Sequence, residues 1–485
     1  MKFTKPTVRL HRLALAASAL LGCVAAVPAS AAGRPGDLDT GFGQGGYVIN
    51  DFFGTNDEVY AIAPMRDGRF VAAGKVNGSN ASGVGGSENM AIARYLPNGS
   101  LDPSFGSGGL VELDVDAGPD EVRALRVLSD GSIIAGGSLT TSSYSDFGLL
   151  KLRPDGSRDT TFGEPDAVTG RRGYARLAIS AAGLHDSAYA MAVQRDGRIV
   201  LAGTTPVFHD GFNYNQVAIA RFTADGLVDT SFGGGDGVVV LDPFYGAAGD
   251  VLTTIALDQS GNLGSDGRIV VGGYAFGRNC AFLARVTANG TPDSSFGQGG
   301  RVVLASASTG GVYSGMSSLA AARIAADGKI IALGTAGDRG LAVMRFTANG
   351  ALDGTFGTNG RSVIKFSGMA DNDEPAALAL QGNGKIVAAG YATNRATGAA
   401  HKDFFVTRWL ANGAIDTGFG EQGYRVSQVA TGQDEAFAVA VEVSGDILAG
   451  GYATRPNVAP RDFAILRLFG DPDRLFADGF DGGLF

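Results

Sequence analysis

Short apolar segments alternate with polar, glycine-rich turns along most of the chain. Between residues 59 and 113, apolar segments at 59–65, 69–73, 90–95 and 109–113 are separated by turns and one polar loop. Segments of this length, bounded by turn residues, predict β-strands. Beyond the N-terminal segment, no window shows a convincing helical period. The pattern therefore predicts an all-β chain in which four short strands form each antiparallel sheet.

The turn between the first two strands of a unit has a recurring sequence. Asp67-Gly68 is followed by an apolar strand, and an equivalent pair occurs in all seven units. Asp-Gly and Asn-Gly tolerate the positive φ of a two-residue hairpin turn, so strands should flank each pair. The other pairs are Asp130-Gly131, Asp196-Gly197, Ser260-Gly261 (with a second pair at Asp266-Gly267), Asp327-Gly328, Asn383-Gly384 and Ser444-Gly445.

A six-residue phrase sets the length of the repeat. It first appears as Leu38-Asp39-Thr40-Gly41-Phe42-Gly43, and successive copies are 57 to 70 residues apart. A repeat of this length cannot bury its apolar face alone, so neighbouring units must stack. Seven four-stranded sheets arranged radially form a seven-bladed β-propeller, which protects most strand edges. An open solenoid of stacked sheets is the structural alternative. The phenylalanines of the phrase are Phe42, Phe105, Phe162, Phe232, Phe296, Phe356 and Phe419.

Six units place a cation eight residues before the aspartate of the phrase. We interpret these as structural pairs that brace a turn. An exposed pair contributes only about 0–1 kcal/mol, whereas a buried phenylalanine contributes roughly 1.5–3 kcal/mol. We therefore expect the seven phenylalanines to be buried at blade edges and to matter more to stability than the charges. The pairs are Arg94–Asp102, Lys151–Asp159, Arg221–Asp229, Arg285–Asp293, Arg345–Asp353 and Arg408–Asp416.

The two ends of the chain each hold half of a seventh pair. Asp39 has no cation eight residues before it, and no phrase follows Arg467 at the usual distance. This predicts that the segment 46–50 is the outer strand of the last blade and pairs with 463–468. Closure by the N-terminal strand would hide two strand edges that otherwise invite aggregation.

These motifs resemble the bacterial delta-60 repeat family. The resemblance rests on the turn and strand DG-[RK]-[IF]-V-x-A-G, the strand end A-R-[YF], and the phrase N-G-x-[LI]-D-x-x-F-G, and it covers about residues 36 to 470. It implies a β-propeller domain of uncharacterised function and brings no catalytic residues with it.

The N-terminal segment has the features of a signal peptide. Lys2, Lys5, Arg9 and Arg12 precede an apolar stretch at 13–27, which is short for a membrane span. Ala29-Ser30-Ala31 fits a cleavage site. We expect a signal peptide at 1–31, the propeller at 36–470, a C-terminal tail at 471–485, and an exported protein with no membrane span. A lipid anchor at Cys23 is the alternative.

The net charge and the few cysteine and histidine residues disfavour several classes of partner and of active site. The formal net charge is −9, and removal of the leader makes the chain more acidic, which disfavours nucleic acid and anionic membranes as partners. The mature chain keeps one cysteine, Cys280, for which we expect a packing role. His185, His209 and His401 fall in different units without metal-ligand spacing. We expect no metal, no cofactor and no nucleophile motif.

One acidic position recurs at a constant distance before the turn. Asp57, Asp120 and Asp434 belong to this series, which should mark the start of the innermost strands. The functional reading is an acidic rim that binds cations or a basic partner. The structural reading, which the recurrence favours, is that each aspartate accepts N–H bonds from a nearby loop. The series is Asp57, Asp120, Asp186, Asp250, Ser317, Asp373 and Asp434.

The loops after the second strand vary most and point to a binding face. They span 75–88, 204–215, 391–403 and 452–462, and they carry His209, Tyr214, Tyr391, His401 and Tyr452. We expect these side chains to surround the rim of Asp57, Asp120 and Asp434, because binding residues concentrate on variable loops of a rigid scaffold. The predicted function is a monomeric, exported, non-enzymatic scaffold that binds a protein or glycan. The alternative is a secreted hydrolase or lyase with its active site on a propeller face.

Overall fold

The computed structural model describes residues 33–78, 88–115, 118–141, 144–163, 165, 173–181, 183–244, 249–258, 267–275, 280–305, 316–336, 340–366, 373–394, 401–455 and 460–471. Across these residues, 28 strands form seven antiparallel sheets of four strands each. None of them lies in a helix long and apolar enough to cross a membrane. The predicted signal peptide, Cys23, the Ser260-Gly261 turn and the tail beyond residue 471 lie outside the described residues.

Each sheet is one blade, numbered from the N-terminus. Blade 1 contains β2 (Asp57–Pro64), β3 (Phe70–Asn77), β4 (Glu88–Tyr95) and β5 (Leu110–Leu113). Blade 2 contains β6 (Glu121–Val127), β7 (Ile133–Thr140), β8 (Ser145–Leu152) and β9 (Tyr174–Leu177). Blade 3 contains β10 (Ser187–Val193), β11 (Ile199–His209), β12 (Phe212–Phe222) and β13 (Val238–Leu241). Blade 4 contains β14 (Asp250–Asp258), β15 (Arg268–Ala275), β16 (Cys280–Val286) and β17 (Arg301–Ala305).

The remaining blades repeat this order. Blade 5 contains β18 (Ser318–Ile324), β19 (Ile330–Thr335), β20 (Leu341–Phe346) and β21 (Arg361–Ile364). Blade 6 contains β22 (Glu374–Leu380), β23 (Ile386–Asn394), β24 (His401–Trp409) and β25 (Tyr424–Ser427). Blade 7 contains β26 (Asp434–Val441), β27 (Ile447–Thr454), β28 (Arg461–Leu468) and, as its outer strand, β1 (Tyr47–Asn50).

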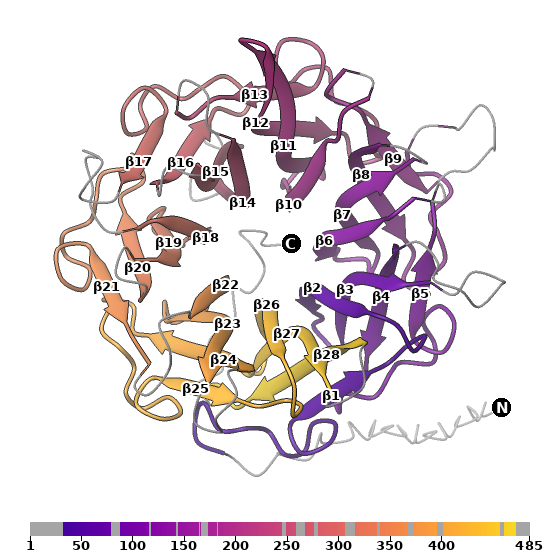
Figure 1. Cartoon of the computed structure of the whole chain (residues 1–485), viewed down its shortest axis with the longest axis vertical. Coiled ribbons are helices and arrows are strands. Elements are labelled where there is room, and N and C mark those ends of the chain that lie inside the picture. Colours follow the sequence, from indigo (N-terminus) through magenta and orange to yellow (C-terminus); the bar gives the residue numbers. More distant parts are fainter. Residues whose placement is uncertain are drawn as a thin grey trace, which may run out of the picture. The chain divides into compact units, whose positions relative to one another are not determined.

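The blades form a closed ring, as Figure 1 shows. The first strand of each blade is innermost and contacts the first strand of the next blade, and β26 of blade 7 contacts β2 of blade 1. The structure thus confirms a seven-bladed β-propeller and excludes the open solenoid.

The N-terminal strand closes the ring, as the half-pairs at Asp39 and Arg467 predicted. β1 pairs antiparallel with β28, and Val48 lies opposite Ile465. Asp39 completes the seventh charge pair, because Arg467 Nε donates to its Oδ2 at 2.8 Å. Blade 7 is therefore assembled from both ends of the described chain.

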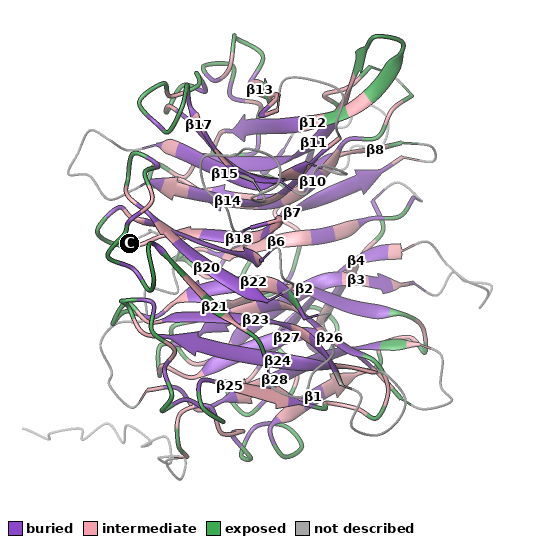
Figure 2. Ribbon diagram, turned by 60° about the vertical axis from the view of Figure 1, so that its left-hand side comes forward, coloured by how far each residue is buried: buried purple, intermediate pink, exposed green. Residues whose placement is uncertain are grey.

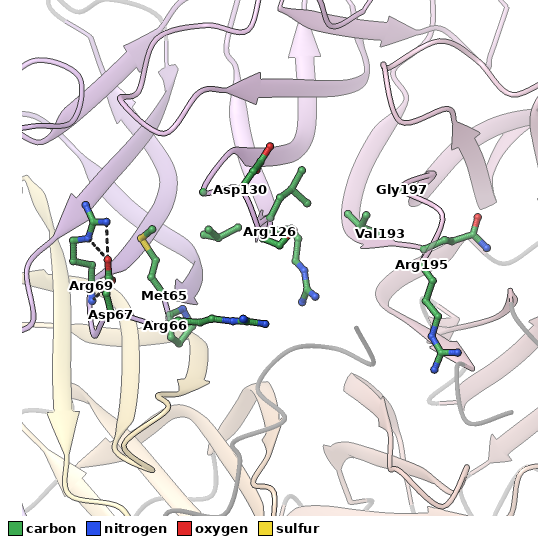
Figure 3. A pocket seen from close by; sticks show the side chains of 15 residues that line it. Met65, Arg66, Asp67, Arg69, Arg126, Asp130, Val193, Arg195 and Gly197 are labelled. Carbon is green, nitrogen blue, oxygen red and sulfur yellow. Dashed lines mark hydrogen bonds and ion pairs between the residues drawn. The ribbon is translucent and has the colours of Figure 1, made fainter. Parts of the chain in front are cut away.

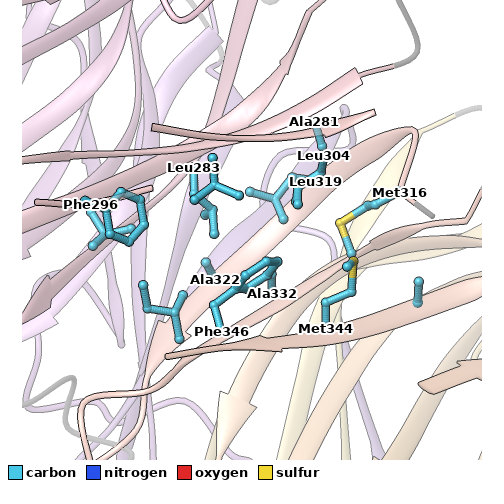
Figure 4. Packing of buried hydrophobic residues seen from close by; sticks show 14 of the residues in the cluster. Ala281, Leu283, Phe296, Leu304, Met316, Leu319, Ala322, Ala332, Met344 and Phe346 are labelled. Carbon is cyan, nitrogen blue, oxygen red and sulfur yellow. The ribbon is translucent and has the colours of Figure 1, made fainter. Parts of the chain in front are cut away.

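Apolar side chains fill the space between neighbouring blades (Figure 4). One such cluster joins Leu283 and Phe296 of blade 4 to Leu319 and Met344 of blade 5. Because both faces of a sheet are covered, a middle strand such as β16 is buried at every position. This explains why the strands read as continuous apolar runs rather than as an alternating pattern. Cys280 begins β16 and is buried, as a packing role requires.

The repeated phrase acts as a clasp between blades, and blade 3 illustrates it. Phe232 is fully buried, and the Gly233 N–H donates to the carbonyl of Asn289 in blade 4 at 2.9 Å. Gly233 has φ of +75°, and a Cβ there would lie 2.0 Å from the Val238 carbonyl oxygen, so only glycine fits. The seven phenylalanines of the phrase are all buried, as predicted.

The cation of each pair is part of the same clasp. Arg221 Nε donates to Asp229 Oδ2 at 2.7 Å, the guanidinium lies over the Phe232 ring at 4.6 Å, and Nη1 donates to the Ala288 carbonyl of blade 4. The low energy expected for exposed pairs does not apply here, because Arg221 is only 2% exposed. Four more arginines reach a carbonyl of the next blade: Arg94 to Pro154, Arg285 to Ala348, Arg345 to Ala411 and Arg467 to Pro97.

Candidate functional site

The strand register defines two faces of the propeller. The start of each innermost strand lies opposite the end of the second strand, as in the pairs Asp57–Val76 and Asp434–Ala453. The loops between second and third strands therefore share one face with the starts of the innermost strands, and we name it the loop face. The Asp-Gly turns and the clasp phrases lie on the opposite side, which we name the turn face.

The recurring aspartates are buried braces of the loop face. Asp57 accepts the Phe52 N–H at 2.8 Å, and Asp120 accepts those of Val115 and Thr140, both at 2.8 Å. Asp434 accepts the N–H groups of residues 429 and 430, each at 2.8 Å. All three side chains are fully buried. This geometry favours the structural reading over an acidic rim open to solvent.

Burial makes two of these carboxyls titrate near neutrality. It raises the pKa of Asp57 to about 7, with Asp51 and Asp462 adding repulsion and the Phe52 N–H opposing the shift. It also raises the pKa of Asp434 to about 7, aided by Asp403 and opposed by the loop N–H groups. A carboxyl whose pKa is higher in the folded state than in the unfolded state favours folding only while it is protonated. Both groups therefore destabilise the fold progressively as the pH rises.

The melting temperature of the chain should fall as the pH rises from about 4 to about 7. The double variant Asp57→Asn, Asp434→Asn should flatten this fall, because asparagine resembles the protonated carboxyl. Below about pH 4 the sign reverses, because clasp aspartates such as Asp293 have lowered pKa values and lose their stabilising charge on protonation. Thermal unfolding followed from pH 3 to 9 checks this. The exposed turn variant Asp130→Asn should keep the wild-type profile, and an equally steep fall in the double variant would contradict the assignment.

The structure brings Tyr391 and Tyr452 into one polar network on the loop face. Lys402 Nζ lies 4.1 Å from the Tyr391 ring centroid and donates to Glu435 Oε1 at 2.7 Å. The Tyr452 hydroxyl donates to the same Glu435 oxygen at 2.6 Å. The Arg461 guanidinium covers the Tyr452 ring at 4.4 Å. Tyr452 is only 3% exposed, so this network is part of the scaffold as well as of the face.

Of the three other predicted binding residues, one lies in blade 6 and two lie in blade 3. His401 begins β24, and its Nε2 lies 3.6 Å from Asp403 Oδ1. His209 and Tyr214 belong to β11 and β12 of blade 3, on the far side of the ring from blades 6 and 7 (Figure 1). The structure therefore splits the predicted site into a blade 6–7 cluster and a separate blade 3 element.

The predicted loops are shorter than expected, because the strands extend into them. Tyr391, His401 and Tyr452 all lie in strands rather than in loops. The largest difference is in blade 3, where the expected loop 204–215 is a hairpin whose strands reach His209 and Phe212. Asp210 and Gly211 form its turn with φ of +50° and +88°. This is the Asp-Gly signal used for the other hairpins, and it identifies this one equally well.

The tip of this hairpin exposes large aromatic side chains. Phe208 is 70% exposed and Phe212 is 66% exposed. Phe212 and Tyr214 lie on one side of the hairpin with ring centroids 6.3 Å apart, and Phe208 pairs with Asn213 on the other side. Figure 2 shows the tip in green at the end of β11 and β12. We name residues 205–216 the aromatic hairpin.

Every innermost strand contains a β-bulge. Each bulge leaves one residue outside the ladder, and those of blades 7, 1 and 2 contact one another. The Phe437 and Tyr60 rings are 5.5 Å apart, and the Arg123 guanidinium lies 3.8 Å from the Tyr60 ring centroid. Blades 5 and 6 have alanine instead, so the ring is bulky and polar on one side only. The bulge residues are Tyr60, Arg123, Tyr189, Thr253, Ala320, Ala376 and Phe437.

The turn face holds a cavity of about 540 Å³ that the sequence interpretation missed. It is lined by the hairpin turns of blades 1, 2 and 3 and includes Arg66, Arg126 and Arg195 (Figure 3). Within the described residues, no group of three His, Cys, Asp or Glu side chains could hold a metal ion.

Six segments match the family described as "Domain of unknown function (DUF5122) beta-propeller". They are residues 66–105, 128–162, 194–232, 264–296, 325–356 and 381–419. Each runs from the first hairpin turn of a blade to the phenylalanine of its clasp. Blade 7 has the same parts, but they are divided between the two chain ends. The chain thus carries β-propeller repeats of a domain of unknown function. No curated protein matches it.

Solved propeller structures resemble the chain only distantly. Sqt1 from Chaetomium thermophilum is 13% identical, covers 87% of this chain and all of its own, and has a TM-score of 0.40. The aldose sugar dehydrogenase of Streptomyces coelicolor, in its PQQ-bound form, is 12% identical over 71% of this chain and 91% of its own, with a TM-score of 0.39. A polysaccharide lyase of family PL25, an ulvan lyase, is 12% identical, covers 92% of this chain and 94% of its own, and has a TM-score of 0.42.

Proposed function

We propose that this chain is an exported, non-enzymatic scaffold that binds a partner protein through its loop face. The exposed aromatic hairpin is the observation that carries this proposal. Large exposed apolar side chains that cluster on a surface mark interaction sites in soluble proteins. Aromatic residues at the centre of an interface supply much of the binding energy.

The shape of the hairpin favours a protein over a glycan. Sites for small ligands are concave, whereas this element is a two-stranded projection with Phe208 on one side and Phe212 on the other. Such a projection fits a groove or pocket on another protein. Its register leaves little freedom, because paired strands run from Ile199 to Phe222 with only Asp210 and Gly211 between them. A rigid anchor loses less conformational entropy on binding than a flexible loop does.

The chemistry of the loop face supports binding more than catalysis. Asp57, Asp120 and Asp434 are buried and already accept N–H groups of nearby loops. Glu435 is engaged by Lys402 and Tyr452. These carboxylates are arranged to hold the scaffold rather than to transfer protons to a substrate.

The double variant Phe208→Ser, Phe212→Ser should weaken binding of the partner at least tenfold without changing the fold. Hot-spot aromatic residues typically contribute 2 kcal/mol or more, while exposed substitutions change stability by about 0.5 kcal/mol or less. The partner is first identified by photo-crosslinking from position 208 in the producing cells. Its affinity for purified wild-type and variant chains is then measured.

Val240→Ser provides a matched control, because Val240 is an exposed apolar residue of the same blade on β13. It should bind the partner as the wild type does. Unchanged affinity of the Phe208, Phe212 double variant would refute the proposal. Hairpin-dependent binding to a glycan array, with no protein crosslinked, would replace the protein partner with a glycan.

A further inference from the structure

The third strand of blade 3 is longer than the outer strand that covers it. β12 pairs with β11 along its whole length, from Phe212 to Phe222. β13 covers only the part from Val217 onward, because Val217 pairs with Leu241, the last residue of β13. On the outer side of β12, residues 212–216 therefore have no paired strand within the described part of the chain. We name residues 212–216 the open edge.

The chain leaves this edge uncovered because it turns toward blade 4 after β13. Pro243 follows two residues after Leu241 and cannot donate to a strand ladder. Its carbonyl accepts from Arg301 Nη1 at 2.7 Å, and the Phe244 ring packs edge-on against Phe282 with centroids 5.6 Å apart. Arg301 and Phe282 both belong to blade 4. The segment that could have extended β13 along the open edge is therefore held elsewhere.

The open edge presents backbone groups at every second residue. The Arg221 N–H donates to the Gly237 carbonyl at 3.0 Å, on the side of β12 where β13 lies. Backbone groups point to alternate sides along an antiparallel strand, so those of Asn213 and Asn215 point to this side as well and away from β11. Both residues are exposed. A row of exposed, unpaired backbone groups is a template for another strand.

The opposite edge of the same hairpin is protected. β11 also extends beyond its neighbour, because Ser187, the first residue of β10, pairs with Thr204. On this overhang Pro206 lies opposite Asn215 and has no N–H to offer. Proline on an edge is a common defence against strand pairing. Residues 212–216 contain neither a proline nor a charged residue, so this defence is missing on the open edge.

We propose that the open edge pairs with an extended segment of the partner protein, which adds a strand to blade 3. The inference rests on the proposed function and names how the aromatic hairpin engages its partner. In this mode of recognition, main-chain hydrogen bonds supply affinity and alternate side chains supply specificity. Phe212 and Tyr214, whose ring centroids are 6.3 Å apart, would flank one face of the added strand. The partner segment should therefore be uncharged and carry apolar side chains at alternate positions.

A second copy of this chain fits the open edge less well. Pairing of two such edges would involve only residues 212–216 of each copy, whereas stable interfaces comprise about 20–30 residues a side. A different protein can pair with the edge and also enclose Phe208 and Phe212 at the tip, which are 70% and 66% exposed.

Peptide binding to the full chain tests this proposal. The probe is a capped peptide in which valine and threonine alternate, with lysines at both ends for solubility, titrated to about 1 mM so that a Kd of that order is measurable. We expect it to bind and to slow amide hydrogen exchange at Asn213 and Asn215. The same peptide with every backbone nitrogen methylated cannot donate to a ladder and should not bind. This comparison leaves the protein unaltered.

The double variant Asn213→Pro, Asn215→Pro removes the two outward N–H groups. It should leave the ladder between β11 and β12 in place, as Pro206 does on the other strand, and weaken peptide binding about tenfold or more. Asn213→Ala, Asn215→Ala is the matched control, because it changes the same side chains and keeps both N–H groups. It should bind the peptide as the wild type does.

Failure of the peptide to bind, equal binding of the methylated peptide, or unchanged binding in the proline variant would each overturn the proposal. Self-association of the chain that the proline variant abolishes would replace the partner segment with a second copy and overturn it too. The protein crosslinked from position 208 separates this inference from the proposed function. If its binding depends on Phe208 and Phe212 but survives in the proline variant, strand pairing is refuted and the proposed function stands. If its binding does not depend on the two phenylalanines, the proposed function itself is refuted.

Discussion

Replacing Phe232 with alanine should lower the free energy of unfolding by about 3–5 kcal/mol. The ring is fully buried in the cluster between blades 3 and 4, and it also carries the Arg221 guanidinium on one face at 4.6 Å. Alanine would leave a cavity at the junction of two blades and would remove this cation–π contact. Denaturant unfolding of the purified chain, compared with the wild type, measures the loss.

Phe208→Ala serves as the control for this measurement. Phe208 is the same residue type in the same blade, but its side chain is 70% exposed. Its replacement should change the unfolding free energy by about 0.5 kcal/mol or less. Similar values for the two variants would mean that the clasp phenylalanine does not hold the blades together.

Replacing Asp229 with alanine should have an effect of comparable size, about 3–5 kcal/mol. Arg221 would remain buried between two blades without its carboxylate, and an uncompensated buried charge is strongly destabilising. The variant also loses the hydrogen bonds that Asp229 accepts from the Ser231 N–H at 3.0 Å and hydroxyl at 2.6 Å. Denaturant unfolding again provides the measurement.

Blade 2 offers a closely matched control in Asp159→Ala. Asp159 accepts the same turn contacts from the Thr161 N–H at 3.1 Å and hydroxyl at 2.7 Å. Its cation, however, is Lys151, whose side chain is 20% exposed and can reach water. The cost should therefore be about 1–2 kcal/mol, the loss of the turn bonds and of a hydrated pair. If Asp159→Ala costs as much as Asp229→Ala, the buried guanidinium is not the source of the effect.

The fold was predictable because every blade repeats the same local signals. Seven copies of the clasp phrase gave the blade number, and the Asp-Gly turns gave the first hairpins. The half-pairs at Asp39 and Arg467 were enough to predict that β1 joins β28, because a charge pair at fixed spacing is a geometric constraint. The burial of the arginines was not predictable in the same way. It depends on the next blade, whose carbonyls receive the guanidinium across some 60 residues of sequence, as Arg221 and Ala288 show.

The candidate sites were harder to predict, because they depart from the repeat. The aromatic hairpin is an extension found in blade 3, and its Asp210-Gly211 turn was hidden inside a segment read as a loop. The cavity on the turn face has no sequence signature, since Arg66 and Arg195 each precede an Asp-Gly pair while Arg126 lies in a strand. Only the ring geometry brings these positions to one cavity. The strand periodicity also did not reveal the bulges, which place Tyr60 and Arg123 beside each other.

Blade 7 combines the first strand with the last three strands, and this has a consequence for how the ring forms. Of the 28 strands, β1 is synthesised first and β28 last, and the paired residues Val48 and Ile465 are 417 residues apart in sequence. Until β28 is available, β1 has no partner strand and blade 7 is incomplete. Contacts of such long range are slow to form, and exposed edges can pair with other chains in the meantime. The ring closes only when β1 pairs with β28. The edges of these two strands are therefore protected from pairing with other chains only after the last strand has been made, however early the other blades form.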